Sequence, residues 1–270
     1  MPCVVPSHQA PVLPLKLWRP HLFSGLGLCL GTIAPDLEFI LLVERDWTFS
    51  HTLAAQSYFT VPLVLFLYFV LVRLALPFWL PRLPQGAPCH FDELLALQVP
   101  RDLGGWARVG VSGYIGGLTH IVIDGVTHGN HSGWLVPYLP FLRAPIGLAG
   151  GWPLHDVLQV VLSIWFAASA CGSWRQIARE HLLWRWRGEA PRRVIPVERA
   201  WSRSALGWIF ACAVVGFVAG PALRGGIGPV AAIDLAAFGA IAFAFYGFLA
   251  LPAAELLIRV AWRATVVRPA

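Results

Sequence analysis

The chain has 270 residues, of which 57% are hydrophobic and only 13% are charged, and its mean hydropathy is +0.65. A soluble domain carries roughly a quarter charged residues, so the composition excludes an ordinary soluble protein and predicts a polytopic membrane protein. The net charge of +6 could suggest a nucleic-acid-binding protein, but Lys16 is the only lysine and the arginines cluster in loops between apolar runs. That distribution is typical of the positive-inside rule, so we expect no nucleic-acid partner.

A bilayer span needs about 20 mostly apolar residues, and runs of this kind follow one another along the chain. In chain order, we expect six main helices over residues 21–34, 54–78, 109–128, 153–173, 204–223 and 230–258. Gly27 and Gly31 in the first helix, and Gly113 and Gly117 in the third, have the spacing that lets two helix backbones approach closely. The sequence therefore predicts an all-α transmembrane bundle in which these two helices pack together.

The basic residues predict which side of the membrane each loop faces. If the loops 79–108 and 174–203 and both termini are cytoplasmic, then only Arg45, Arg143 and Arg224 lie on the other side. This asymmetry predicts a multi-pass protein of the inner, or plasma, membrane. We divide it into a membrane-embedded metal-site domain (1–173), an Arg/Trp-rich cytoplasmic or interfacial segment (174–203) and a C-terminal two-helix hairpin (204–270).

The third expected helix carries a polar stripe. His120, Asp124 and His128 are four residues apart, so their side chains lie along one face of a helix. Ionisable side chains at membrane depth are costly, and they usually mark functional sites. A structural cluster that holds helices together by hydrogen bonds is the alternative explanation.

The expected topology brings further polar residues to the same, non-cytoplasmic end of the bundle. Asp36 and Glu38 follow the first expected helix, His51 comes just before the second, and His155 opens the fourth. Because the topology argument did not use these residues, their convergence supports a common site.

Imidazole and carboxylate groups without thiolates suit zinc, and also manganese or iron. The five cysteines are scattered without a CxxC pair, so we expect neither a disulfide framework nor a thiolate site. We therefore predict a site for a divalent metal, with zinc as the first candidate. The candidate ligands are Asp36, His51, His120, Asp124, His128 and His155. Asp36 and Glu38 are also candidates for a general base.

Several motifs resemble those of the bacterial domain-of-unknown-function 4184 membrane proteins over roughly residues 1–160. They are Ser7-His8-Gln9-Ala10-Pro11, Ala34-Pro35-Asp36-Leu37-Glu38, Ser50-His51-Thr52 and the stripe from His120 to His128. That family is similar to inner-membrane metal-dependent hydrolases of the YdjM-like type and, more remotely, to helical zinc enzymes of the phospholipase C and P1 nuclease type. The resemblance implies that His8 is a further metal ligand. The HxxxE pattern that it implies at His155 is absent, since Leu158 and Gln159 stand there.

If His8 is a ligand, the N-terminal segment must return to the end of the bundle that holds Asp36. This predicts an N-terminal half-helix hairpin with its inner turn at residues 16–20, whose irregular backbone must be buried in protein.

The function that the resemblance implies is hydrolysis of a phosphoester by a water molecule whose pKa is lowered by a metal. A membrane lipid headgroup is one candidate substrate, and membrane lipids are the expected partners. The alternative is a non-enzymatic membrane protein, either a metal or proton transporter or a helix scaffold. A transporter should carry polar residues on to the cytoplasmic side, whereas the stripe ends at His120.

Overall fold

The computed structural model describes residues 7–38, 49–83, 90–129, 132–147, 151–193, 199–222 and 229–266. Within these ranges the chain is mostly helical, and its strands form one short antiparallel pair, β1 (Pro145–Ile146) with β2 (Trp152–Pro153). Among the described residues, four helical stretches are long and apolar enough to cross a membrane: Gln56–Arg82, Leu103–Thr127, Leu154–Arg179 and Phe243–Val260. The prediction of a mostly helical chain is confirmed, and these four stretches have the length and composition that a membrane span requires.

Six spans are not confirmed in the described part of the chain. The expected helix over 21–34 is the seven-residue helix α2 (Gly25–Gly31), which is too short to cross a bilayer. It begins where the Ser24 hydroxyl caps the backbone N–H of Gly27, and it ends at Thr32, just before the turn at Pro35. Helix α9 (Arg199–Ala222) covers all but the last residue of the fifth expected helix.

The described residues fall into two compact units. Unit 1 takes them from 7–38, 49–68 and 99–190, and unit 2 takes them from 69–83, 90–98 and the ranges after 190.

Unit 2 contains η4 (Leu71–Ala75), α5 (Leu76–Trp79), η5 (Leu80–Arg82), η6 (Phe91–Ala96), α9 and α10 (Pro229–Val266). The indole of Trp79 stacks on Phe248 of α10 and donates a hydrogen bond of 2.9 Å to its carbonyl oxygen. This carbonyl is available because Pro252, four residues later inside α10, has no backbone N–H to donate to it. The proline therefore creates an acceptor that fastens α5 to α10.

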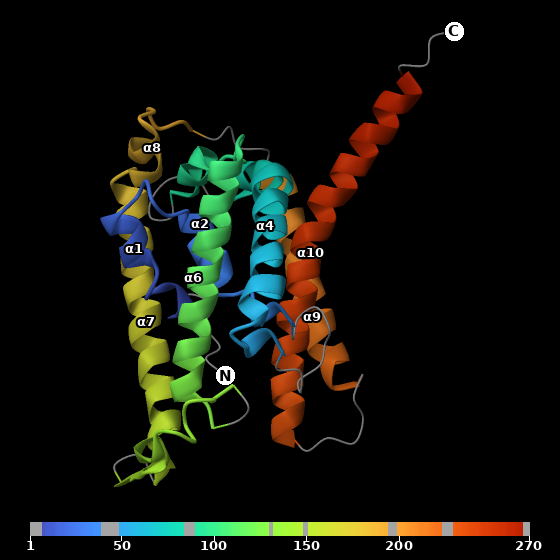
Figure 1. The fold of residues 1–270 in the computed structure, drawn as a ribbon. Helices are drawn as coiled ribbons and strands as arrows, with labels where there is room; N and C mark the ends of the chain where they lie inside the picture. Colours follow the sequence, from blue (N-terminus) through green and yellow to red (C-terminus); the bar gives the residue numbers. More distant parts are fainter. Residues whose placement is uncertain are drawn as a thin grey trace. The chain divides into compact units, whose positions relative to one another are not determined.

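Unit 1 holds the remaining helices. They are η1 (Ser7–Gln9), α1 (Leu13–Trp18), α2, η2 (Phe49–His51), η3 (Gln56–Thr60), α4 (Val61–Val70, whose last two residues belong to unit 2), α6 (Leu103–Thr127), η7 (Pro140–Arg143), α7 (Leu154–Arg179) and α8 (Leu182–Arg187). In Figure 1, α6 (green) has α2 and α7 (yellow) as neighbours. The short helices η1, α1 and α2 are the first described helices of the chain. A buried apolar cluster joins α1 and α2 to α7 and α8, and it contains Leu13, Cys29, Ala170, Ile177 and Leu182.

Helices α2 and α6 approach each other through glycines. A Cβ added to Gly31 would lie 2.1 Å from the carbonyl oxygen of Gly113, and one added to Gly116 would lie 2.3 Å from that of Leu28. No side chain fits in either place, so the predicted packing of these two helices is confirmed. The close approach brings the end of α2, at Thr32, against the middle of α6.

Candidate metal centre

Helix α6 provides two members of the centre. Asp102 caps its first turn by accepting a hydrogen bond of 2.7 Å from the backbone N–H of Gly105, and 25 residues then run without a break. His120 and Asp124 lie one turn apart on the buried face, and His120 has no exposed surface. The stripe predicted from the four-residue spacing therefore points into unit 1.

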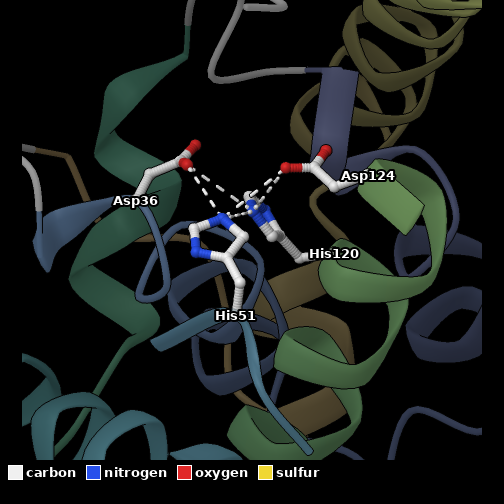
Figure 2. Close-up of side chains that lie close together, drawn as sticks. All are labelled: Asp36, His51, His120 and Asp124. Atoms are coloured by element: carbon white, nitrogen blue, oxygen red, sulfur yellow. Dashed lines mark hydrogen bonds and ion pairs between the residues drawn. The ribbon is translucent and has the colours of Figure 1, made fainter. Parts of the chain in front are cut away.

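Two further side chains meet these residues from other parts of unit 1. Figure 2 shows Asp36, from the turn after α2, and His51, from η2, converging on the ring of His120, with the carboxylates of Asp36 and Asp124 on either side. The Nε2 atom of His120 lies 3.5 Å from Asp36 Oδ1 and 3.3 Å from Asp124 Oδ2. The Nε2 atom of His51 lies 3.7 Å and 3.6 Å from the same two oxygens. One ligand atom from each of the four residues lies within 4.8 Å of the others, a grouping that could hold a metal ion.

The turn that carries His51 is held by buried polar groups. The backbone N–H of Ser50 donates to Glu38 Oε2 at 3.0 Å, and the Gln56 amide donates to the Ser50 carbonyl at 2.7 Å. The Ser50 hydroxyl donates to the carbonyl of Pro35 at 3.0 Å. Glu38 is therefore placed behind His51, bound to the backbone, and it is not among the four clustered residues.

Hydrogen bonds at the outer ring nitrogens determine which tautomer each clustered histidine takes. The Nδ1 atom of His120 is 2.8 Å from the carbonyl oxygen of Thr32, which can only accept. The Nδ1 atom of His51 is 3.0 Å from the Ser50 hydroxyl, whose own proton goes to Pro35. In the neutral form of either ring, the Nδ1 atom therefore carries the proton and the Nε2 lone pair points into the cluster. Partners of this kind orient histidines at metal sites.

The centre attracts positive charge. Burial alone would lower the pKa of His51, but the nearby carboxylates of Asp124 and Asp36 raise it above its ordinary value. Burial alone would raise the pKa of Asp36, yet the nearby His120 and His51 lower it. Two carboxylates and two imidazole lone pairs thus converge on a space that favours a cation.

The other carboxylate oxygen of Asp124 lies near two further histidines. This Oδ1 atom lies 4.0 Å from His8 Nε2 and 3.7 Å from His128 Nδ1. Among the described residues, neither this oxygen nor either ring nitrogen of His8 has a hydrogen-bond partner, although all three atoms are buried. Burial, followed by the repulsion of His120, lowers the pKa of His8 to about 4. His8 is therefore neutral near pH 7, and one of its ring nitrogens has a lone pair that can bind a metal.

The remaining candidates have other partners. His128 follows the last residue of α6, and burial lowers the pKa of its ring. Its Nδ1 atom is 3.1 Å from the Thr127 hydroxyl, and its Nε2 atom is 3.4 Å from the Gln159 amide nitrogen. The Nδ1 atom of His155 lies 2.9 Å from Asp156 Oδ1 without forming a hydrogen bond, and His155 is outside the four-residue group.

The sequence-predicted residues therefore separate into three sets. Asp36, His51, His120 and Asp124 form the cluster, His8 and His128 adjoin it through Asp124, and Glu38 and His155 lie outside it. The sequence analysis assigned no role to the residues that hold the clustered histidines in place, namely Thr32, Ser50 and Gln56. Ser50 and Gln56 flank the His51 motif as polar residues beside an apolar run, which is a weak signal, whereas the Thr32 carbonyl gives no sequence signal.

Comparison with known proteins gives one match. The family model described as "Domain of unknown function (DUF4184)" matches residues 1–253, which extends well beyond the region in which the sequence motifs were recognised. No curated protein and no solved structure matches the chain. These comparisons do not show a relationship to the YdjM-like hydrolases or to the phospholipase C and P1 nuclease enzymes.

Proposed function

The chain belongs to the DUF4184 family, whose function is unknown. From the geometry of its His/Asp cluster, we propose that it is a membrane-bound, metal-dependent hydrolase of phosphoesters. One observation carries the proposal: the Nε2 atoms of His51 and His120 are 3.3 Å apart, each with its Nδ1 proton directed elsewhere. Two lone pairs and two carboxylates at this separation repel one another unless a cation lies among them.

Asp36, His51, His120 and Asp124 would hold the ion, and their nitrogen and oxygen donors suit zinc best. Bound there, a divalent ion supplies a Lewis acid and lowers the pKa of water toward neutrality. Asp36 is the most open of the four, with 30% of its side chain exposed, whereas His51, His120 and Asp124 are buried. Its Oδ2 atom is the oxygen not used toward His51 and His120, so Asp36 is our choice for the group that accepts a proton from an attacking water.

The proposal extends to location and substrate. The arginine distribution supports a multi-pass protein of the inner membrane with the centre toward the non-cytoplasmic side. His120 and Asp124 belong to a helix long enough to span the bilayer, so membrane phosphoesters are the substrates nearest to hand. Asp124 Oδ1 and His8 are unpartnered and buried among the described residues, which supports His8 as an additional ligand.

A second candidate, a non-enzymatic membrane protein, is favoured by the same distances. A proton on His120 Nε2 would also satisfy Asp36 and Asp124, which lie 3.5 Å and 3.3 Å away. The cluster would then be an ion-pair network that joins α6 to the turns at Asp36 and His51, without any metal.

Elemental analysis of detergent-purified protein loaded with zinc separates the two candidates. We expect a stoichiometric, dialysis-resistant ion in the wild type and its loss in His120→Ala. His21→Ala, which changes an exposed histidine in the turn before α2, is the matched control and should keep the ion. Equal metal content in His120→Ala and the wild type, or no retained ion in either, would contradict the metal centre.

Turnover then separates an enzyme from a metal-binding protein. Wild type and His21→Ala should release product from a phospholipid or a soluble phosphodiester, and His120→Ala should not. A wild-type protein that retains its ion and turns over neither substrate would contradict the hydrolase.

A further inference from the structure

A small cavity lies on the side of His8 that faces helix α7. It has a volume of about 10 Å3, which is room for roughly one water molecule. Ser7 and His8 of η1 line it together with Thr127 of α6 and Gln159 and Ser163 of α7. The His8 ring also packs on His120, with centroids 4.3 Å apart, so one lining residue of the cavity contacts the candidate metal centre.

This cavity opens on the flank of two spanning helices. Its apolar margin consists of Ile123 of α6 and Leu162 and Phe166 of α7, and all three side chains are partly exposed. Beside them, Val122 of α6 is 47% exposed and Ile164 of α7 is 68% exposed. Exposed aliphatic side chains within a span are typical of a surface that faces lipid.

The lining also limits what the cavity can bind. Among the described residues that line it, none is Asp, Glu, Lys or Arg, and the polar groups are hydroxyls, one amide and the His8 ring. Such a lining suits an uncharged group with hydrogen-bonding oxygens, and it provides no cation for a free phosphate. The glycerol-ester portion of a phospholipid has this chemistry, with acyl chains attached that match the apolar margin.

We infer that the cavity is a lateral port, through which a membrane phospholipid places its uncharged ester portion beside His8 while its chains lie against α6 and α7. The inference rests on the proposed function, because it assigns the lipid as the substrate whose phosphate reaches the metal centre. Since the cavity holds only about one water molecule, Leu162 and Phe166 must move aside to admit the ester group.

A bulky side chain at the port tests the inference. Ser163→Trp would fill the cavity, whereas Ser169→Trp adds the same bulk on an exposed face of the same helix and is the matched control. In nanodiscs of phosphatidylethanolamine and phosphatidylglycerol, native mass spectrometry should detect a retained phospholipid on the wild type and on Ser169→Trp. We expect Ser163→Trp to lose it while its metal content stays unchanged. Leu162→Trp is the second variant if Ser163→Trp yields little folded protein.

Turnover adds a second readout. Phospholipid hydrolysis by Ser163→Trp should fall at least tenfold, while hydrolysis of a soluble phosphodiester should stay within about twofold of wild type. Unchanged lipid retention in both port variants would overturn the port even if the wild type is an active enzyme. Loss of retained lipid in these variants would support the port even if the wild type hydrolysed nothing, which would contradict only the proposed function.

Discussion

The Nε2 atoms of His51 and His120 face each other at 3.3 Å, although the two residues are 69 positions apart in the chain. Each ring is turned by an acceptor at its other nitrogen, the Ser50 hydroxyl for His51 and the Thr32 carbonyl for His120. The pair therefore depends on hydrogen bonds outside the cluster, and these bonds can be changed without removing any of the four clustered residues.

Ser50→Ala removes the acceptor that orients the His51 ring. The imidazole remains, but nothing then favours the tautomer whose Nε2 lone pair points into the cluster. Loss of such a supporting contact typically weakens metal binding by roughly 10- to 100-fold, and we expect a change of this size. Competition with a chelator of known affinity measures it. Ser169→Ala, which removes a hydroxyl that bonds only to its own helix at Trp165, should bind metal as the wild type does.

Glu38 supports the turn at His51 through the backbone of Ser50, and a glutamine can accept the same hydrogen bond. We expect Glu38→Gln to keep both metal and turnover, and Glu38→Ala to lose metal affinity because the Ser50 N–H is left buried without a partner. Metal content and hydrolysis rates for both variants provide the check. If Glu38→Gln retains its metal and yet loses turnover, Glu38 acts as a general base and the positioning role is wrong.

Gly31→Ala places a methyl group where the backbone of Gly113 already lies, so α2 must move away from α6. We expect a loss of about 1–3 kcal/mol in the free energy of unfolding, with weaker metal binding because Thr32 moves away from His120. Gly172→Ala on α7 is the control, since its added Cβ would meet nothing within 4 Å. It should be neutral or stabilising by up to about 1 kcal/mol, because alanine favours a helix. Thermal unfolding in detergent measures the stability of Gly31→Ala and Gly172→Ala. Equal midpoint temperatures for the two variants would contradict the close packing of α2 on α6.

Acid should destabilise the metal-free protein through His8. Burial lowers the pKa of His8 to about 4 in the folded protein, whereas the unfolded chain has the ordinary value of 6.5. Between these values the unfolded chain binds more protons, so the free energy of unfolding falls as the pH falls from about 6.5 to about 4. His8→Asn cannot take up this proton and should show a shallower pH dependence in unfolding experiments with excess chelator. If the free energy of unfolding of the wild type and of His8→Asn changes equally with pH, His8 is exposed to water in the folded protein and the buried position is wrong.

Features that depend on local sequence were predicted well. Low charge and long apolar runs indicated a helical membrane protein, and the four-residue spacing placed His120 and Asp124 on one buried helix face. The glycines of the first and third expected helices indicated that α2 and α6 pack together. Each of these inferences uses only helix periodicity or residue size, which neighbouring residues determine.

Features that depend on the path of the turns were predicted less well. Apolar composition alone suggested a full span over 21–34, but the cap at Ser24 and the turn before Pro35 limit α2 to seven residues. His155 was expected among the ligands, and it is not one of the four residues that the structure groups together.

The sequence by itself therefore determined the class of the protein, the buried stripe on α6 and the chemistry of the available ligands, because hydrophobicity and helix periodicity act over a few residues. Only the tertiary structure decided that Asp36 and His51, rather than Glu38 and His155, complete the cluster with His120 and Asp124. That choice depends on distances of a few ångströms between separate segments. These distances follow from the glycine contacts of α2 with α6 and from the hydrogen bonds of Ser50, which sequence spacing does not reveal.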